Sequence, residues 1–243
     1  MAKDKKGGFI KNSIRRFRRL LLKILILLVI ITVVEVIILK FFNPPFTVAK
    51  ARDWIQHRIR SKEYKGPLYL WRDLNEISPY LRKAVLAGED QRFLYHHGFD
   101  FIEVKQALKD ILFTDRTRGA STISMQVARS VYLVPNRTVS RKLAEAYYTV
   151  LIELFWKKER IFEMYLNTVD WGKGIMGAEA ASLKYFRIHS DRLSPAQAGR
   201  LAAILPSPHK WSPTSGNSDV DKRYKWIMKH IEKMPLISCR PRR

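Results

Sequence analysis

Cysteine is scarce in this sequence, because Cys239 is the single one among 243 residues. One thiol can form neither an internal disulfide nor a cysteine-based zinc cluster within the monomer. Stability must therefore come from packing, and a hydrophobic content of 47% supplies one compact core. We expect one anchored domain and no second large catalytic domain within 243 residues.

Acidic residues are also in short supply. The chain carries 22 aspartates and glutamates against 45 lysines and arginines, which gives a formal charge of +23. A surface this cationic works next to something anionic, such as nucleic acid, lipid headgroups or a phosphorylated substrate. Charge by itself does not choose among the three.

Strand signals are few and no repeat occurs at solenoid spacing, so the pattern predicts a mainly α fold. The best strand candidate is 68–71. Ser194 before Pro195 is typical of a helix start, and Ser140 stands before a helix with Arg141 and Glu145 one turn apart. We expect helices at 79–94, 101–112, 121–133, 140–156, 158–167, 175–185 and 195–205.

Residues 20–42 form one long apolar run, interrupted by Lys23, Glu35 and Lys40. About 20 such residues at 1.5 Å rise match the hydrocarbon thickness of a bilayer. The run is followed by Pro44-Pro45 and bulky residues instead of a small-residue cleavage site, which predicts a retained transmembrane anchor. Glu35 has no explanation in the sequence.

The segment 1–19 is rich in lysine and arginine, and such a flank stays on the cytoplasmic side. The rest of the chain is then extracytoplasmic, which argues against a nucleic-acid partner. Residues 49–62 fit a short amphipathic helix that lies on the membrane or packs in a core. We divide the chain into a basic cytoplasmic segment 1–19, anchor 20–42, juxtamembrane segment 43–77, catalytic domain 78–213, and C-terminal helix and basic tail 214–243.

Two segments carry candidate chemistry. In the first, 87–100, the adjacent carboxylates of Glu89 and Asp90 end an apolar helix. Burial disfavours the charged form of a carboxylate, which suits a proton acceptor near neutrality. An ordinary exposed helix end explains these residues equally well.

In the second segment, 118–129, Gly119 precedes the hydroxyl residues Ser121 and Thr122 at a helix start. Free backbone amides and the positive end of the helix dipole bind phosphate at such a place. The GxxxxGK[ST] spacing of a nucleotide P-loop is absent.

Together these segments resemble the glycosyltransferase domain of peptidoglycan polymerases, which occurs alone in monofunctional biosynthetic transglycosylases and at the N-terminus of class A penicillin-binding proteins. EDQRFLYHHGFD is similar to the family signature ED-x-x-F-x-x-H-x-G-x-D, and GASTISMQ to G-x-ST-I-[ST]-Q-Q. RKLAE, ERIFEMYLN, WGKGIMGAEAASLKYF and LSPAQAGRLAAILPSP follow in the family's order. The resemblance implies a lysozyme-like helical glycosyltransferase domain with a membrane-facing jaw.

Three positions depart from the family pattern. Met125 stands at a usual glutamine, Arg129 at a common lysine, and Gln197 at a common glutamate. Met125 removes one polar side chain from the expected site. Arg129 keeps the positive charge and adds a bidentate fork that suits phosphate.

The resemblance implies that Glu89 is the general base, that Asp90 orients or tunes it, and that Glu145 is a second catalytic glutamate. An ordinary ion pair between Glu145 and Arg141, worth a few tenths of a kcal/mol, is the alternative. Phosphate or sugar contacts are expected from Ser121, Thr122, Gln126, Arg129, Arg137, Arg141 and Lys142. Structural residues near the site are Phe93, Gly98, Gly119 and His97, the last as a hydrogen-bonding residue.

We expect no metal site at the adjacent histidines His96 and His97, because neighbouring residues on a helix point in different directions. No cofactor is obligatory, and a divalent cation, Mg²⁺ or Mn²⁺, is left open at Glu145. The aromatic set is expected in the core: Trp156, Tyr165, Trp171, Tyr185 and Phe186. Residues 101–117 mix apolar and basic types and fit either the jaw or a packing helix.

The implied function is polymerisation of lipid-linked disaccharide, lipid II, at the bacterial inner membrane with the catalytic domain in the periplasm. The implied partners are lipid II, the growing glycan strand and membrane lipids, with cell-wall synthesis or division proteins as further candidates. One alternative is a lysozyme-like enzyme that cleaves glycan with the same kind of glutamate. Another is an inactive membrane scaffold for cell-wall synthesis.

Overall fold

The computed structural model describes residues 3–45, 68–113, 119–134, 136 and 138–239, with only the backbone described for 3–13, 68 and 111. The chain divides into one unit of Met1–Asn43 and a second unit of Pro44–Arg243. The amphipathic helix expected at 49–62 lies outside the described residues.

The first unit is the helix α1, Lys3–Phe41. Its part Ile14–Phe41 has a mean hydropathy of 3.0 in its most apolar window and is long and apolar enough to cross a membrane. The expected apolar anchor helix is therefore present. The helix begins at Lys3, so most of the basic segment 1–19 continues directly into the anchor.

The second unit is mostly helical, which confirms the expected fold class. Its α-helices are α3 (Pro79–Glu89), α4 (Phe101–Phe113), α5 (Ile123–Tyr132), α6 (Val139–Phe155), α7 (Lys158–Thr168), α8 (Ala178–Phe186), α9 (Pro195–Ile204) and α10 (Ser218–His230). Short 3₁₀ helices are η1 (Leu74–Glu76), η2 (Phe93–Tyr95), η3 (Ser190–Arg192) and η4 (Ile231–Lys233).

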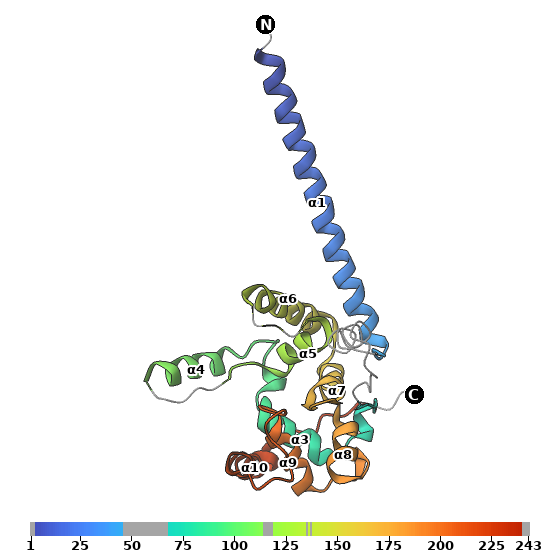
Figure 1. Cartoon of the computed structure of the whole chain (residues 1–243), viewed down its shortest axis with the longest axis vertical. Coiled ribbons are helices and arrows are strands. Elements are labelled where there is room, and N and C mark those ends of the chain that lie inside the picture. Colours follow the sequence, from blue (N-terminus) through green and yellow to red (C-terminus); the bar gives the residue numbers. More distant parts are fainter. Residues whose placement is uncertain (1–2, 46–67, 114–118, 135, 137, 240–243) are drawn as a thin grey trace, which may run out of the picture. The chain divides into compact units, whose positions relative to one another are not determined.

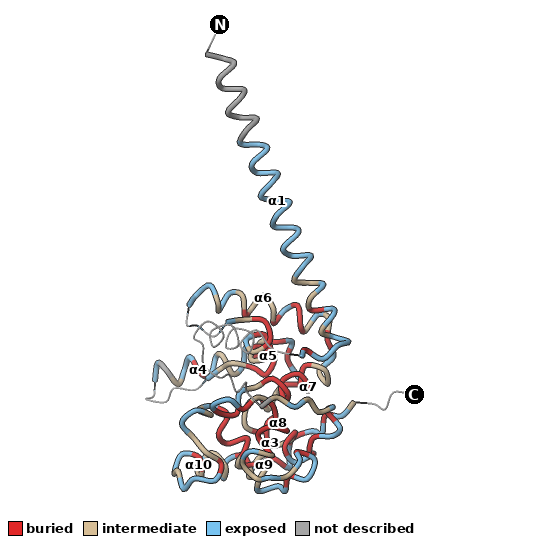
Figure 2. Tube along the Cα trace, turned by 45° about the vertical axis from the view of Figure 1, so that its right-hand side comes forward, coloured by how far each residue is buried: buried red, intermediate tan, exposed pale blue. Residues whose placement is uncertain are grey.

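These helices form two groups with α7 between them (Figure 1). Helices α3, α8, α9 and α10 gather at one end, and α3 packs against α9 and α10. At the other end α5 packs against α6 and α7, while α4 extends outward as an arm. Buried residues are concentrated where the two groups meet (Figure 2). The largest fully buried side chains include Trp171, Tyr165, Phe93 and Phe162.

The second unit also contains a small β-sheet. Its order is β1 (Leu68–Tyr69), β3 (Ile175–Met176) and β2 (Asp170–Gly172), with β1 parallel and β2 antiparallel to β3. The strand candidate 68–71 corresponds to β1, but the helix expected at 175–185 begins only at Ala178. The reason is Gly177, which has φ +85 and lies so close to Asn167 that a Cβ would stand 2.7 Å from its carbonyl oxygen.

Two other helix ends also differ from the sequence expectation. The helix expected at 79–94 ends at Glu89, because Asp90 leaves helical geometry with φ −160 and its carboxylate binds the amide of Ile123. The cap of α6 is Thr138 instead of Ser140: the Thr138 hydroxyl accepts a hydrogen bond from the Arg141 amide at 3.2 Å.

Helix α9 begins as expected at Pro195, with Ser194 as its cap. The Gln197 side chain accepts from the Ser194 amide at 3.0 Å, and the Ser194 hydroxyl accepts from the Gln197 amide at 3.3 Å. Glutamine and glutamate both complete such a capping box. The departure at Gln197 therefore leaves the helix start intact.

The C-terminal helix α10 packs closely on two other helices. A Cβ at Gly199 of α9 would lie 2.8 Å from the Met228 sulfur, and a Cβ at Gly88 of α3 would lie 3.2 Å from Ile227. The described part of segment 214–243, which we set apart from 78–213 by sequence, packs against α3 and α9 through α10 and η4.

Glu179 provides a test of the packing between α8 and η3. Burial raises the pKa of Glu179, but hydrogen bonds from Ser190, His189 and Arg72 outweigh it and lower the pKa to about 2. A carboxyl whose pKa falls on folding stabilises the protein above its unfolded pKa, and this contribution is lost as pH falls toward the folded value. We expect Glu179→Gln to lower the melting temperature at pH 7.

Thermal unfolding of both proteins across the acid range checks this prediction. The difference in melting temperature should shrink as pH falls from 4.5, the ordinary pKa of a glutamate, toward the folded pKa of about 2. A difference that stays constant with pH would contradict the ionised role of Glu179.

Candidate active site

Glu89 lies at the C-terminal end of α3 with its side chain 11% exposed. Its two carboxylate oxygens have different donors. Arg223 of α10 donates from Nη2 to Oε1 at 2.8 Å, and Gln126 of α5 donates from Nε2 to Oε2 at 2.9 Å. Three helices that are distant in sequence thus meet at this carboxylate, which is held in place instead of pointing into bulk water.

Tyr165 of α7 extends this hydrogen-bonded chain. Its hydroxyl donates to the Gln126 Oε1 at 3.4 Å, which leaves the amide nitrogen for Glu89. Burial raises the pKa of Tyr165 well above its usual value, the charge of Glu89 raises it further, and Arg129 and Arg223 oppose these effects. The hydroxyl therefore stays protonated. Tyr165 is buried as expected for a core residue, and the structure adds this role at the site.

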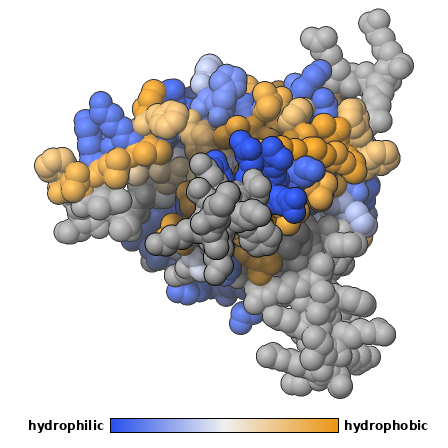
Figure 3. Space-filling model, turned by 90° about the horizontal axis from the view of Figure 1, so that it is seen from above, coloured by the Kyte–Doolittle hydropathy of each residue, from blue (hydrophilic) through white to orange (hydrophobic). Residues whose placement is uncertain are grey.

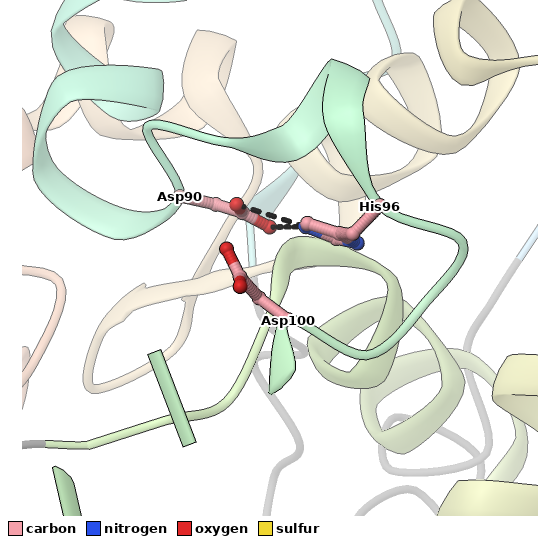
Figure 4. Close-up of side chains that lie close together, drawn as sticks. All are labelled: Asp90, His96 and Asp100. Carbon is pink, nitrogen blue, oxygen red and sulfur yellow. Dashed lines mark hydrogen bonds and ion pairs between the residues drawn. The ribbon is translucent and has the colours of Figure 1, made fainter. Parts of the chain in front are cut away.

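Asp90 is turned into the protein, where it meets His96 and Asp100 (Figure 4). Both of its carboxylate oxygens lie 3.0 Å from the His96 Nε2, and Oδ2 also accepts from the Ile123 amide at 3.0 Å. Asp90 therefore ties the end of α3 to the first residue of α5, the helix that carries Gln126.

Asp100 stands beside this pair and begins α4. Its Oδ1 accepts from the amides of Ile102 and Glu103, and its Oδ2 accepts from the Arg92 Nε at 3.0 Å. The ligand atoms of Asp90, His96 and Asp100 all lie within 4.8 Å of one another, a spacing that could hold a cation. Every carboxylate oxygen of Asp90 and Asp100 already accepts a hydrogen bond, so we interpret the group as a buried structural cluster.

The hydrogen-bonding histidine of this segment is His96, not His97 as expected. His96 is buried, whereas His97 is exposed. The short helix η2 turns His96 inward beneath Phe93, whose ring lies 6.2 Å from the imidazole. The spacing of the ED-x-x-F-x-x-H-x-G-x-D signature itself falls on His96, so this assignment was available in the sequence.

Gly98 and Thr122 hold the turn before α4 against the start of α5. Gly98 has φ +89, and a Cβ there would lie 2.7 Å from the Thr149 Cγ2. The Thr122 hydroxyl donates to the Gly98 carbonyl at 2.5 Å and accepts from the Met125 amide at 3.3 Å. Thr122 is buried and its hydroxyl is used within the fold, whereas Ser121 is only half-buried.

A second cluster lies on α6 around Glu145, which is fully buried. Arg141 donates to its Oε2 at 2.5 Å, and Lys142 donates to its Oε1 at 2.7 Å. The expected pair of Glu145 with Arg141 is therefore present, although a buried carboxylate with two cations differs from a solvated surface pair. A divalent cation at Glu145 would have to displace Arg141 or Lys142.

The remaining expected residues fall around these clusters. Arg129 is exposed in the last turn of α5, and its charge acts on Tyr165 next to Glu89. Met125 is buried, so its side chain packs in the protein at the position where the family has a glutamine. Phe93 is buried against Phe162, with ring centroids 5.9 Å apart. Arg137 lies outside the described residues.

Sequence reasoning missed Arg223, because α10 follows the last quoted motif and its sequence resembles an ordinary basic helix. It also missed the site role of Tyr165, which stands inside ERIFEMYLN as one of two aromatic residues. No pattern in the sequence distinguishes a tyrosine that orients Gln126 from a tyrosine of the core.

The two site glycines offer a matched pair of substitutions. Gly98→Ala should lower the free energy of unfolding by about 1–3 kcal/mol, because the residue has φ +89 and its new Cβ would overlap Thr149. Gly119→Ala should have little effect, since a Cβ there meets nothing within 4 Å. Denaturant unfolding of the two variants measures the difference, and equal stability would contradict the assigned role of Gly98.

Comparison with known proteins identifies the family of this chain. A family model described as transglycosylase matches residues 58–232. A biosynthetic peptidoglycan transglycosylase of Caulobacter vibrioides is 43% identical over 88% of this chain and 91% of the relative. Proteins of the same name from Pseudomonas aeruginosa (40% identical, 88% of this chain, 92% of the relative) and Chromohalobacter salexigens (50%, 68% and 70%) are also similar. The chain therefore belongs to the transglycosylase family.

Proposed function

We propose that this transglycosylase polymerises the glycan strands of peptidoglycan from lipid-linked disaccharide, with Glu89 as the general base. The observation that carries the proposal is the Glu89 carboxylate, held by Gln126 and Arg223 at the end of α3. Membership of the family and the names of the relatives support the reaction.

In this reaction the 4-hydroxyl of the acceptor sugar attacks the anomeric carbon of the growing chain, and the lipid pyrophosphate leaves. A sugar hydroxyl is a poor nucleophile at neutral pH, so a carboxylate takes its proton as the new bond forms. Arg223 pairs with one oxygen of this carboxylate at 2.8 Å. Gln126 and Tyr165 keep the carboxylate in one orientation.

The departing pyrophosphate gains negative charge as the glycosidic bond breaks, so fixed cations stabilise the transition state. Arg129 is exposed near Glu89 and can reach such a group. Arg141 and Lys142 are held by the buried carboxylate of Glu145, which fixes their position before substrate arrives. We assign Glu145 to ordering these cations.

The cations also weigh against a glycan-cleaving function. A lysozyme-like hydrolase acts on a finished strand that has no pyrophosphate to neutralise. Its catalytic glutamate is a general acid kept protonated by an apolar pocket, whereas Glu89 is paired with Arg223.

The domain also presents apolar surface suited to the lipid part of the substrate and to the bilayer. Val139, Leu143, Tyr147, Val150 and Leu154 form an exposed stripe along α6 at helical spacing. The arm formed by α4, at the left of Figure 3, carries apolar residues beside hydrophilic ones, with Phe113 80% exposed. Exposed patches of this kind mark membrane or partner contacts.

We further propose that the basic N-terminal segment is cytoplasmic and that the catalytic domain lies in the periplasm. The support is the excess of lysine and arginine before the apolar span Ile14–Phe41. Lipid II, the growing strand and membrane lipids are the partners that follow from this placement.

Glu89→Gln should reduce polymerisation of lipid-linked disaccharide by about 10²- to 10⁴-fold, because the amide cannot accept the hydroxyl proton. Glu232→Gln is the control, since Glu232 is an exposed carboxylate in η4. Polymer length on gels measures both variants. Retained polymerisation by Glu89→Gln would refute the base assignment, and shortening of preformed strands by the native protein would favour hydrolysis.

The apolar stripe of α6 should lie in the lipid headgroup region. A fluorophore on Leu154→Cys in the Cys239→Ser protein, reconstituted in lipid nanodiscs, should be quenched by brominated lipid, because Leu154 is 71% exposed on that stripe. The same fluorophore on Lys222→Cys of α10 is the control. Equal quenching at both positions would contradict the membrane contact.

A further inference from the structure

We propose that Arg223 is a positioning residue for the reaction, and that α10 is the element that delivers it to the catalytic base. The inference rests on the proposed function of Glu89 as the base. The side chain of Arg223 is 27% exposed, and one of its nitrogens, Nη2, donates both to the Glu89 Oε1 at 2.8 Å and to the Gly88 carbonyl at 2.6 Å.

Those two contacts act on different parts of the same turn. The carbonyls in the last turn of a helix have no partner within the helix. By binding the Gly88 carbonyl and the Glu89 carboxylate together, Arg223 fixes the backbone and the side chain of the base at once. Gln126 fixes the other carboxylate oxygen from the opposite helix group. The carboxylate therefore has little freedom to rotate away from an acceptor hydroxyl.

The absence of a side chain at Gly88 allows Arg223 and Ile227 of α10 to come this close to α3. A Cβ on Gly88 would lie 3.2 Å from the Ile227 Cδ1 and 3.7 Å from the Arg223 Nη2, so a larger residue would crowd α10. Ile227 is fully buried one turn after Arg223 and seats the helix on α3. The cap of α10 is Asn217, whose side chain accepts from the amides of Asp219 and Val220.

The guanidinium of Arg223 contacts Glu89 but leaves one of its own donors without a partner among the described residues. The Arg223 Nε is buried and has no hydrogen-bond partner among the described residues, which costs stability. A residue that served only to attach α10 to α3 would do so with an apolar side chain, as Ile227 does. The charge next to Glu89 is the feature that such a residue would lack.

Other groups remain around Glu89 when Arg223 is replaced. Among the described residues, Gln126 and Arg129 lie on α5, Tyr165 on α7, and the paired Asp90 and His96 follow α3. The Gln126 contact still holds one carboxylate oxygen, so loss of Arg223 frees the other oxygen of Glu89 and the Gly88 carbonyl.

The test uses the full-length protein in detergent with lipid-linked disaccharide, and kcat and KM are measured separately. Arg223→Gln should lower kcat by about 10- to 100-fold, less than loss of the base itself, and change KM by less than about twofold, because the base loses its orientation while substrate binding is kept. Arg223→Lys keeps the charge with fewer donors, so it should recover most of the lost kcat. Lys222→Gln removes the same charge from a side chain that is 79% exposed on the same helix, and should change neither quantity.

Melting temperatures of the variants separate positioning from folding. Activity of Arg223→Gln within about twofold of the native protein would overturn the inference, as would a loss that appears in KM with kcat unchanged. If the native protein itself forms no polymer, the proposed function fails. If it polymerises and Arg223→Gln behaves like Lys222→Gln, only the role of Arg223 is refuted.

Discussion

The carboxylate of Glu89 depends on two donors that approach it from opposite sides of the domain. One comes from α5 and one from α10, and both must be within hydrogen-bond distance of a side chain at the end of α3. Because α3 ends at Glu89, the carboxylate can face α5. Because Gly88 has no side chain, α10 can come close to the end of α3.

The position of α5 depends in turn on the buried residues behind Glu89. Asp90 binds the first amide of α5, and the Thr122 hydroxyl binds the carbonyl of Gly98. Asp100 starts α4 and pairs with Arg92. Each of these acids is buried, and a buried charge is tolerated only when donors satisfy it. This buried cluster therefore fixes α5, which carries Gln126 and Arg129, relative to the base, and it does so at the expense of desolvating several charges.

Part of the positive charge of this chain is paired with buried carboxylates. Buried carboxylates such as Glu145 and Glu179 hold arginines and lysines in defined places. Arg129 remains exposed near the base and is available to an anionic group. Both the fixed cations and the apolar surfaces of α4 and α6 suit the lipid-linked pyrophosphate that we propose as substrate.

Local patterns in the sequence determined the apolar anchor, the helical class and the start of α9 at Ser194-Pro195, because these features depend on neighbours in the chain. The resemblance of the ordered motifs to the family signatures gave Glu89, Gln126, Arg141 and Glu145 as candidates. Only the tertiary structure decided that α3 stops at Glu89, that a strand occupies 175–176, and that Tyr165 and Arg223 join the site. Each of those outcomes arises from a contact between residues far apart in sequence, and a residue's own neighbours carry no record of such a contact.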